Sequence, residues 1–361
     1  MIRLRLDPAL FEPRPRTLLT APGLVVETFR FASGVEALRL AGTRTRLVVL
    51  PFRGQQIWRA EVDGRDLTMR SIIPEPVATG GFLESFGAFF LHCGLTAMGA
   101  PGPGDSHPLH GEFPAAPMDE AWLEVTEDTE GSLVRLTGRR DYAQVFKAAY
   151  RAEPAITLRS GDTVFDVAMT VTNRLASPMP FMYLGHANFR PVDGGRLAYS
   201  AHYDAASVRL RSDIPSHITP SPDYARQLAA LARDPAGHHR FETGLAYDPE
   251  VVFFIDYLAG QDGFAHSLQI HPDGRGDWIA HRPEQCPMAM RWLSRTPDQD
   301  CLALAEPATS GVGGFTAEKA ARRVPVLQPG ASWTAHMRMG HLDAEACVRM
   351  EQAIDRIAGR R

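Results

Sequence analysis

Ile57-Trp58-Arg59-Ala60-Glu61-Val62 is followed by Asp63-Gly64 and then by Asp66-Leu67-Thr68-Met69. An Asp-Gly pair between two such runs is typical of the tight turn that joins antiparallel strands. This stretch therefore predicts a β-hairpin, and its pattern recurs along most of the chain.

Short apolar or alternating runs, broken by Gly, Pro and Asp, make up most of the remaining sequence. This pattern predicts many strands joined by turns. Long helices that alternate with strands are missing, which argues against a doubly wound nucleotide-binding fold. We therefore predict an all-β architecture, with strands in or near residues 23–31, 45–52, 55–62, 133–137, 163–172, 179–184, 251–256, 302–306 and 333–339.

Two helices interrupt this pattern. Ser221 and Pro222 can cap and open a helix over residues 223–233, and Asp343 can cap a helix in the last segment of the chain. Apolar residues recur in that last segment at spacings of three or four, which favours a helix packed on the sheet over a partner-binding helix. With 361 residues and 44% hydrophobic composition, we expect one domain over residues 1–342 and a C-terminal helix within 343–361 packed on it.

Charge and cysteine content exclude several classes of protein. The formal net charge is -4, so neither a nucleic acid nor a membrane surface is an expected partner. No apolar run reaches the roughly 18 residues of a membrane span. The four cysteines form no Cys-x-x-Cys pair, which argues against a disulfide framework and a closed zinc site. We predict a cytoplasmic protein with reduced thiols.

Residues 94–117 are unusually rich in Gly and Pro and predict a long irregular loop. His107 and His110 lie within this loop, and His92 lies just before it. Long loops inside compact domains are often functional. We therefore interpret this segment as a binding loop.

Two titratable residues stand at the ends of apolar strands. His186 follows Pro180-Phe181-Met182-Tyr183-Leu184, and Glu306 closes Cys301-Leu302-Ala303-Leu304-Ala305. Such a pair could act as general acid and base if the two strand ends meet. A histidine satisfied by a backbone carbonyl and a solvated carboxylate are the alternatives, and sequence spacing does not decide between them.

Other motifs are weaker. His92, His107, His110 and His186 could ligate a metal, but they lack the close spacing typical of such sites, so we predict no metal and no cofactor. His110-Gly111-Glu112 has no matching Pro-Cys-x-x-Cys of the zinc deaminases. The glycines at 311, 313 and 314 lack the remaining features of a dinucleotide loop.

The order of these motifs resembles the aldose 1-epimerases, also called galactose mutarotases. The resemblance rests on Leu109-His110-Gly111, on Asn173-Arg174 before the strand that ends in His186-Ala187-Asn188-Phe189, on Leu304-Ala305-Glu306-Pro307, and on 327–333. It covers about residues 34–342 and is greatest for a divergent branch in which a strand with Met290-Arg291-Trp292 leads into the Glu-Pro motif.

The resemblance implies a β-supersandwich, mainly antiparallel, with a sugar cleft. It also implies that His186 is the general acid toward the ring oxygen, Glu306 the general base toward the anomeric hydroxyl, and His110 a sugar-binding residue. Such a reaction opens and recloses the sugar ring by proton transfer and needs neither metal nor cofactor. The expected partner is a small carbohydrate, with a homodimer left open.

Four further residues are candidates for substrate binding: Arg53, Asn188, Asp256 and Trp292. Asp256 is proposed for the position of the family's substrate-binding aspartate, and ordinary packing is the alternative for Arg53 and Trp292. Gly111-Glu112 replaces the glycine pair of the well-studied mutarotases, so the substrate is not assigned. Two other functions stay open: epimerisation, isomerisation or elimination of a keto sugar with the same His/Glu pair, and carbohydrate binding without catalysis.

Overall fold

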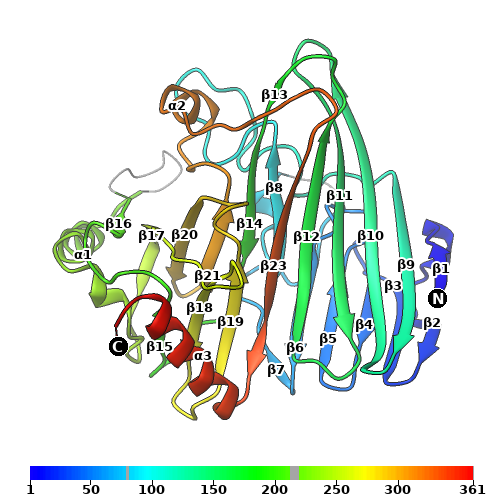
Figure 1. Cartoon of the computed structure of the whole chain (residues 1–361), viewed down its shortest axis with the longest axis horizontal. Helices are drawn as coiled ribbons and strands as arrows, with labels where there is room; N and C mark the ends of the chain where they lie inside the picture. The colour runs from blue at the N-terminus through cyan, green and yellow to red at the C-terminus, as the bar shows by residue number, and fades with distance from the viewer. Residues whose placement is uncertain (79–80, 212–218, 361) are drawn as a thin grey trace.

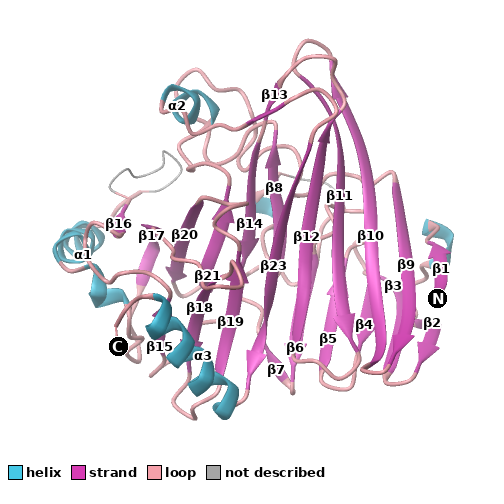
Figure 2. Cartoon of the chain, in the orientation of Figure 1, coloured by secondary structure: helices cyan, strands magenta, loops and turns pink. Residues whose placement is uncertain are grey.

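The computed structural model describes residues 1–78, 81–211 and 219–360. Within them, two large antiparallel sheets pack face to face (Figures 1 and 2). The fold is thus an all-β sandwich, as the sequence predicts. One sheet has nine strands in the order β1 (Ile2–Arg5), β9 (Glu120–Asp128), β10 (Gly131–Gln144), β11 (Ala148–Arg159), β12 (Val164–Asn173), β23 (Ser332–Leu342), β19 (Gly276–His281), β18 (Ala265–Ile270) and β15 (Arg196–Tyr199).

The second sheet has twelve strands and contains both His186 and Glu306. Its order is β16 (Val208–Leu210), β17 (Tyr247–Ile255), β20 (Met288–Arg295), β21 (Asp300–Ala308), β14 (Met182–Ala187), β8 (Phe90–Leu95), β6 (Ile57–Val62), β5 (Thr45–Val49), β4 (Glu36–Ala41), β3 (Leu24–Arg30) and β2 (Arg16–Ala21), with β7 (Arg65–Asp66) beside β6.

The remaining elements lie outside the two large sheets. A separate pair is formed by β13 (Met179–Pro180) and β22 (Val326–Leu327). The α-helices of the described residues are α1 (Pro222–Arg233), α2 (Phe315–Ala320) and α3 (Ala344–Ile357), and the 3-10 turns are η1 (Pro8–Leu10), η2 (Leu83–Ser85) and η3 (Pro235–His238). No helix in the described part of the chain is both long and apolar enough to span a membrane.

Side-chain alternation along the strands builds the core. In β12 every second residue, Phe165, Val167, Met169 and Val171, is fully buried, and the residues between them are partly exposed. The predicted hairpin is confirmed: Val62 pairs with Arg65 across a turn in which Asp63 and Gly64 both have positive φ. Its second strand, however, covers only Arg65–Asp66.

Helix capping follows the sequence. The Oγ atom of Ser221 accepts a hydrogen bond from the Tyr224 amide at 3.1 Å, and an Asp343 carboxylate oxygen accepts one from the Ala346 amide at 2.8 Å. Cys347 and Ile354 on α3 then pack in one apolar cluster with Leu268 of the nine-stranded sheet. Figure 1 shows α3 lying along this sheet near β15 and β18.

One predicted strand is divided. The expected strand over residues 179–184 separates at Phe181, where the chain leaves its pairing with β22 and enters β14 beside β8. After the break, β14 lies between β8 and β21 in the middle of the twelve-stranded sheet. His186 and Glu306 therefore belong to neighbouring strands.

Candidate active site

A cavity of about 350 Å³ lies against strands β14, β17, β20 and β21. The twelve-stranded sheet has apolar side chains on both faces: one set packs against the nine-stranded sheet, and a second cluster includes Phe86, Met290 and Leu184. The cavity borders this second cluster, and residues near η2 and in the loop over 94–117 also line it. Mixed apolar and titratable walls of this kind are typical of small-molecule sites.

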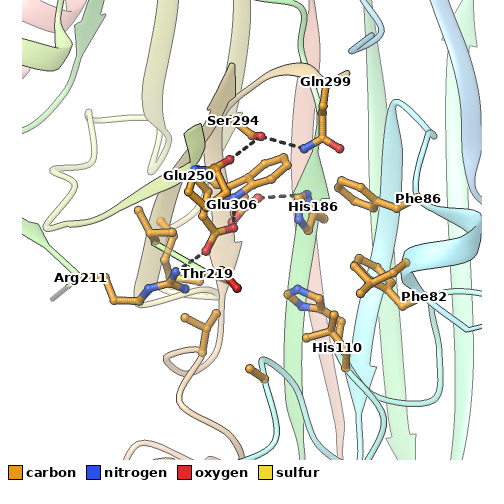
Figure 3. A pocket seen from close by; sticks show the side chains of 18 residues that line it. Phe82, Phe86, His110, His186, Arg211, Thr219, Glu250, Ser294, Gln299 and Glu306 are labelled. Atoms are coloured by element: carbon orange, nitrogen blue, oxygen red, sulfur yellow. Dashed lines mark hydrogen bonds and ion pairs between the residues drawn. The ribbon is translucent and has the colours of Figure 1, made fainter. Parts of the chain in front are cut away.

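His186 and Glu306 meet in this cavity. The Nδ1 atom of His186 lies 3.0 Å from Oε1 of Glu306, and about 5% of each side chain is exposed. The two atoms are within ion-pair distance, but their geometry is not that of an aligned hydrogen bond. The structure thus brings together the two residues that the sequence analysis selects as acid and base (Figure 3).

His110 reaches the same cavity from the loop. Its amide donates to the Gly99 carbonyl at 3.0 Å, and its carbonyl accepts from the Gly94 amide at 2.9 Å. These bonds hold His110 at a φ of 59°, a left-handed conformation that non-glycine residues seldom adopt outside constrained sites. The centroids of the His110 and His186 rings are 5.5 Å apart, so the loop brings a second imidazole to the cavity.

Two phenylalanines complete this wall. The ring of Phe82 is 4.7 Å from that of His110, and the ring of Phe86 is 5.1 Å from that of His186. Figure 3 shows both rings on the same side of the cavity as the histidines. Neither phenylalanine was selected from the sequence, because a residue in an irregular segment has no periodicity that reveals its facing.

Trp292 also lines the cavity, where it bonds to a carboxylate. Its Nε1 donates to Oε2 of Glu250 at 2.6 Å, and Arg211 forms an ion pair with Oε1 of the same carboxylate. The Trp292 ring meets that of His186 edge-on, with centroids 5.5 Å apart. Glu250 and Arg211 were missed. The available signal was that Glu250 directly precedes the apolar run of the strand over residues 251–256.

Three predicted substrate-binding residues do not line this cavity. Arg53 donates to the Ala78 carbonyl at 2.8 Å and borders a different hollow. The Asn188 side chain is fully buried and donates to the Ala88 carbonyl at 2.8 Å. The Asp256 carboxylate is 61% exposed and pairs with Arg209. In each case the side chain is already engaged elsewhere.

The other candidate histidines are also apart from the site. His92 is buried and bonds to the Tyr183 hydroxyl at 2.8 Å, and burial lowers the pKa of His92 to about 3. His107 lines a separate hollow beside Asp105. The four histidines therefore do not converge on one metal.

A second cluster contains His271, Asp277 and His341, whose ligand-type atoms lie within 4.8 Å of one another. Arg65 contacts both oxygens of Asp277, at 2.7 and 3.1 Å. Burial alone would raise the pKa of Asp277, but hydrogen bonds from the histidines and Arg65 together lower it below its usual value. Because a cation here would face a guanidinium, these residues fit a buried ion-pair network better than a metal site.

Comparisons with known proteins agree with the fold. The sequence model of a family described as "Domain of unknown function (DUF4432)" matches residues 32–340. No curated protein matches the chain.

Solved structures give the same architecture. A protein from Klebsiella pneumoniae described as a "putative aldose 1-epimerase" is 22% identical, with a TM-score of 0.80 over 93% of this chain and 88% of its own. A galactose mutarotase-like protein from Clostridium acetobutylicum is 12% identical, with a TM-score of 0.58 over 89% and 99%. At such identities the likeness shows the fold alone, and the predicted galactose mutarotase-like β-sandwich is confirmed.

Proposed function

The chain belongs to the DUF4432 family, and from the site it carries we propose that it is an isomerase of the aldose 1-epimerase type. It would interconvert the α and β anomers of an aldose or aldose derivative. The observation that carries this proposal is the contact of His186 with Glu306, at 3.0 Å inside the cavity. An imidazole and a carboxylate are the two groups that this reaction needs.

The chemistry follows from the two side chains. Glu306 accepts the proton of the anomeric hydroxyl, and the imidazolium of His186 donates a proton to the ring oxygen as the bond between that oxygen and the anomeric carbon breaks. The free aldehyde rotates and the ring recloses on its other face, with both protons returned. Each positioned transfer typically contributes about 10² to 10⁴ in rate.

The contact between the two residues constrains how the sugar binds. A separation of 3.0 Å leaves no room for another atom between Nδ1 and Oε1. We infer that the sugar either separates the pair or uses the remaining atoms, Oε2 of Glu306 and Nε2 of His186. His110 then orients the sugar from the loop, and the rings of Phe82 and Phe86 offer it an apolar face.

The other wall offers polar partners. Glu250 is held between Trp292 and Arg211, and Ser294 and Gln299 lie beside it in the cavity. A fixed carboxylate can accept hydrogen bonds from sugar hydroxyls. We assign Glu250 the substrate-binding role for which Asp256 was the sequence candidate. We further place the enzyme in the cytoplasm, where its four free cysteines would stay reduced.

The test is exchange NMR of the purified chain with a panel of aldoses, deoxy sugars, uronic acids and keto sugars. Magnetisation transfer between anomers should accelerate for at least one sugar. The Glu306→Gln variant should lose this acceleration, and Glu124→Gln on β9, whose carboxylate pairs with Arg3 at the far edge of the fold, should keep it.

Three outcomes would contradict the proposal. Deuterium incorporation at a sugar carbon from heavy water would indicate a carbon-acid reaction. Saturable binding without faster exchange would indicate a carbohydrate-binding protein. Undiminished exchange in Glu306→Gln would remove this carboxylate from the mechanism.

A further inference from the structure

The strand that carries Glu306 is irregular at the site. In the pairing of β20 with β21, Met290 lies opposite Glu306, but Trp292 lies opposite Ala303. Strand β21 therefore has one more residue than β20 across this short interval, which is a β-bulge opposite Arg291. A bulge changes which side chains face each side of a sheet. Here it lets Trp292 and Glu306, on either side of it, both line the cavity.

The carbonyl of Leu304 lies inside the bulge and is held by side chains. It accepts hydrogen bonds from Arg291 Nε at 3.1 Å, from the Ser267 hydroxyl at 2.9 Å and from the Tyr257 hydroxyl at 3.2 Å. A bulge interrupts the regular ladder and leaves backbone groups in need of other partners. Three donors on one carbonyl, two residues before Glu306, fix the backbone at this point.

Arg291 organises these donors. It is completely buried, and its Nη2 also bonds to the Ser267 and Tyr257 hydroxyls, at 2.9 and 3.2 Å. The Tyr199 ring lies 4.1 Å from the guanidinium carbon. Within the described residues no carboxylate forms an ion pair with Arg291. Burying a charge without a counter-ion is costly, and the hydrogen bonds that Arg291 forms here offset that cost.

His238 supplies the last contact as a neutral acceptor. Its Nε2 accepts from Arg291 Nη1 at 2.9 Å, and its Nδ1 bonds to the Pro235 carbonyl. Burial and the adjacent Arg291 charge lower the pKa of His238 well below its usual value, which keeps the lone pair on Nε2 available. All of the guanidinium's nitrogens are thereby engaged.

We propose that Arg291 is the positioning residue for Glu306: through the Leu304 carbonyl it fixes the β21 bulge that turns the carboxylate into the cavity. Arg291 touches no substrate in this arrangement, since it does not line the cavity. The catalytic consequence rests on the proposed function, whereas the structural consequence does not.

Conservative substitutions in this hydrogen-bond network test the positioning role of Arg291. Arg291→Lys keeps the charge but cannot reach all of these acceptors at once. The double variant Ser267→Ala with Tyr257→Phe keeps Arg291 and removes two donors to the Leu304 carbonyl. Thr45→Val is the matched control, because it also loses a buried hydroxyl, one that donates to the Asp162 carbonyl at 2.7 Å away from β21.

The kcat and KM for anomer exchange would be measured on a sugar that the wild type converts, together with the melting temperature. We expect kcat of Arg291→Lys and of the double variant to fall about 10- to 100-fold, because displacing a catalytic group by about 1 Å has effects of this size. KM should change less than about twofold. Thr45→Val should keep kcat, even if its melting temperature falls equally. Retention of wild-type kcat in a folded Arg291→Lys variant would overturn the proposal. If Arg291→Lys does not fold, Arg291→Met, which removes the bond to the Leu304 carbonyl without burying an unpaired charge, takes its place with the same expectation.

Crystal structures of the same variants give a second readout that needs no substrate. In the Arg291 variant, the pairing of Met290 with Glu306 and of Trp292 with Ala303 should shift. The Glu306 carboxylate should then leave the cavity. An unchanged bulge and carboxylate would refute the proposal. If the wild type converts no sugar, the proposed function fails, and the crystallographic comparison still decides the role of Arg291.

Discussion

Nδ1 of His186 lies 3.0 Å from Oε1 of Glu306, with His186 on β14 and Glu306 on the neighbouring strand β21. The pairing of Leu184 with Ala308 brings the two strands into register at this point. Both side chains are nearly buried, in an environment where electrostatic interactions between such close groups are strong. The two residues should therefore act as one unit.

This coupling predicts non-additive kinetics. His186→Ala and Glu306→Gln should each reduce accelerated anomer exchange by about 10² to 10⁴. The variant with both changes should be little less active than the less active of the two single variants, because the two proton transfers belong to one ring-opening step and do not contribute independently. Exchange NMR of all four forms measures this. Losses that multiply would show that the two residues act separately.

Replacing Glu250 should affect KM and not kcat, because in the proposed reaction this residue binds the sugar and transfers no proton. Glu250→Gln keeps an acceptor for Trp292 Nε1 but leaves the Arg211 charge without its partner. We expect KM to rise about tenfold, which corresponds to about 1.4 kcal/mol, with kcat nearly unchanged. A fall in kcat at constant KM would instead make Glu250 a transition-state group.

The buried network around Asp277 predicts a pH-dependent stability. Asp277→Asn should lower the free energy of unfolding by about 3 kcal/mol, because Arg65 then loses the buried carboxylate that it pairs with. The pKa of Asp277 is lower in the folded than in the unfolded chain. Its contribution is therefore complete above about pH 5 and is lost as the pH falls toward the folded pKa.

Urea denaturation at pH 7 and at steps down to pH 3 would measure this. The difference between wild type and Asp277→Asn should shrink with acidification. Asp256→Asn is the matched control, since the exposed Asp256 carboxylate pairs with Arg209 at the surface and should matter by less than about 0.5 kcal/mol. A constant difference at all pH values would contradict the assigned pKa direction.

The sequence predicts local features of this fold well because they depend on neighbouring residues. Alternation along 163–172 and the Asp63-Gly64 turn specify strands and a hairpin, and Ser221 and Asp343 cap their helices as expected. Strand-end positions indicate His186 and Glu306, the Gly- and Pro-rich loop indicates His110, and the resemblance in motif order implies their roles. Their convergence needed the strand order, which brings β14 beside β21.

The missed features depend on tertiary contacts. Asn188 follows His186 by two residues, yet its amide turns to the Ala88 carbonyl, and no sequence pattern distinguishes that orientation from one that faces a cavity. Asp256 stands just after β17, where it meets Arg209 outside the site. The β21 bulge is also unreadable from sequence, because an extra residue in one strand is defined only relative to its partner.

The loop that carries His110 leads to the last prediction. Gly111 has a φ of 81°, and a Cβ added there would lie 2.2 Å from the Ala97 carbonyl oxygen and 2.6 Å from that of Gly94. Both contacts are with backbone of the same loop, so Gly111→Ala must move the segment that holds His110 in the cavity. Gly104 lies in this loop with a φ of 87°, but nothing lies within 4 Å of an added Cβ.

The two glycines therefore separate backbone strain from displacement of His110. Gly104→Ala should cost about 1–2 kcal/mol of stability from its left-handed conformation alone and leave anomer exchange intact. Gly111→Ala should have the same strain and also lose exchange about as strongly as His110→Ala, because the imidazole no longer reaches the sugar. Exchange NMR and denaturation of the three variants decide between these outcomes. Full exchange in a folded Gly111→Ala variant would show that the position of His110 in the loop does not matter to the reaction.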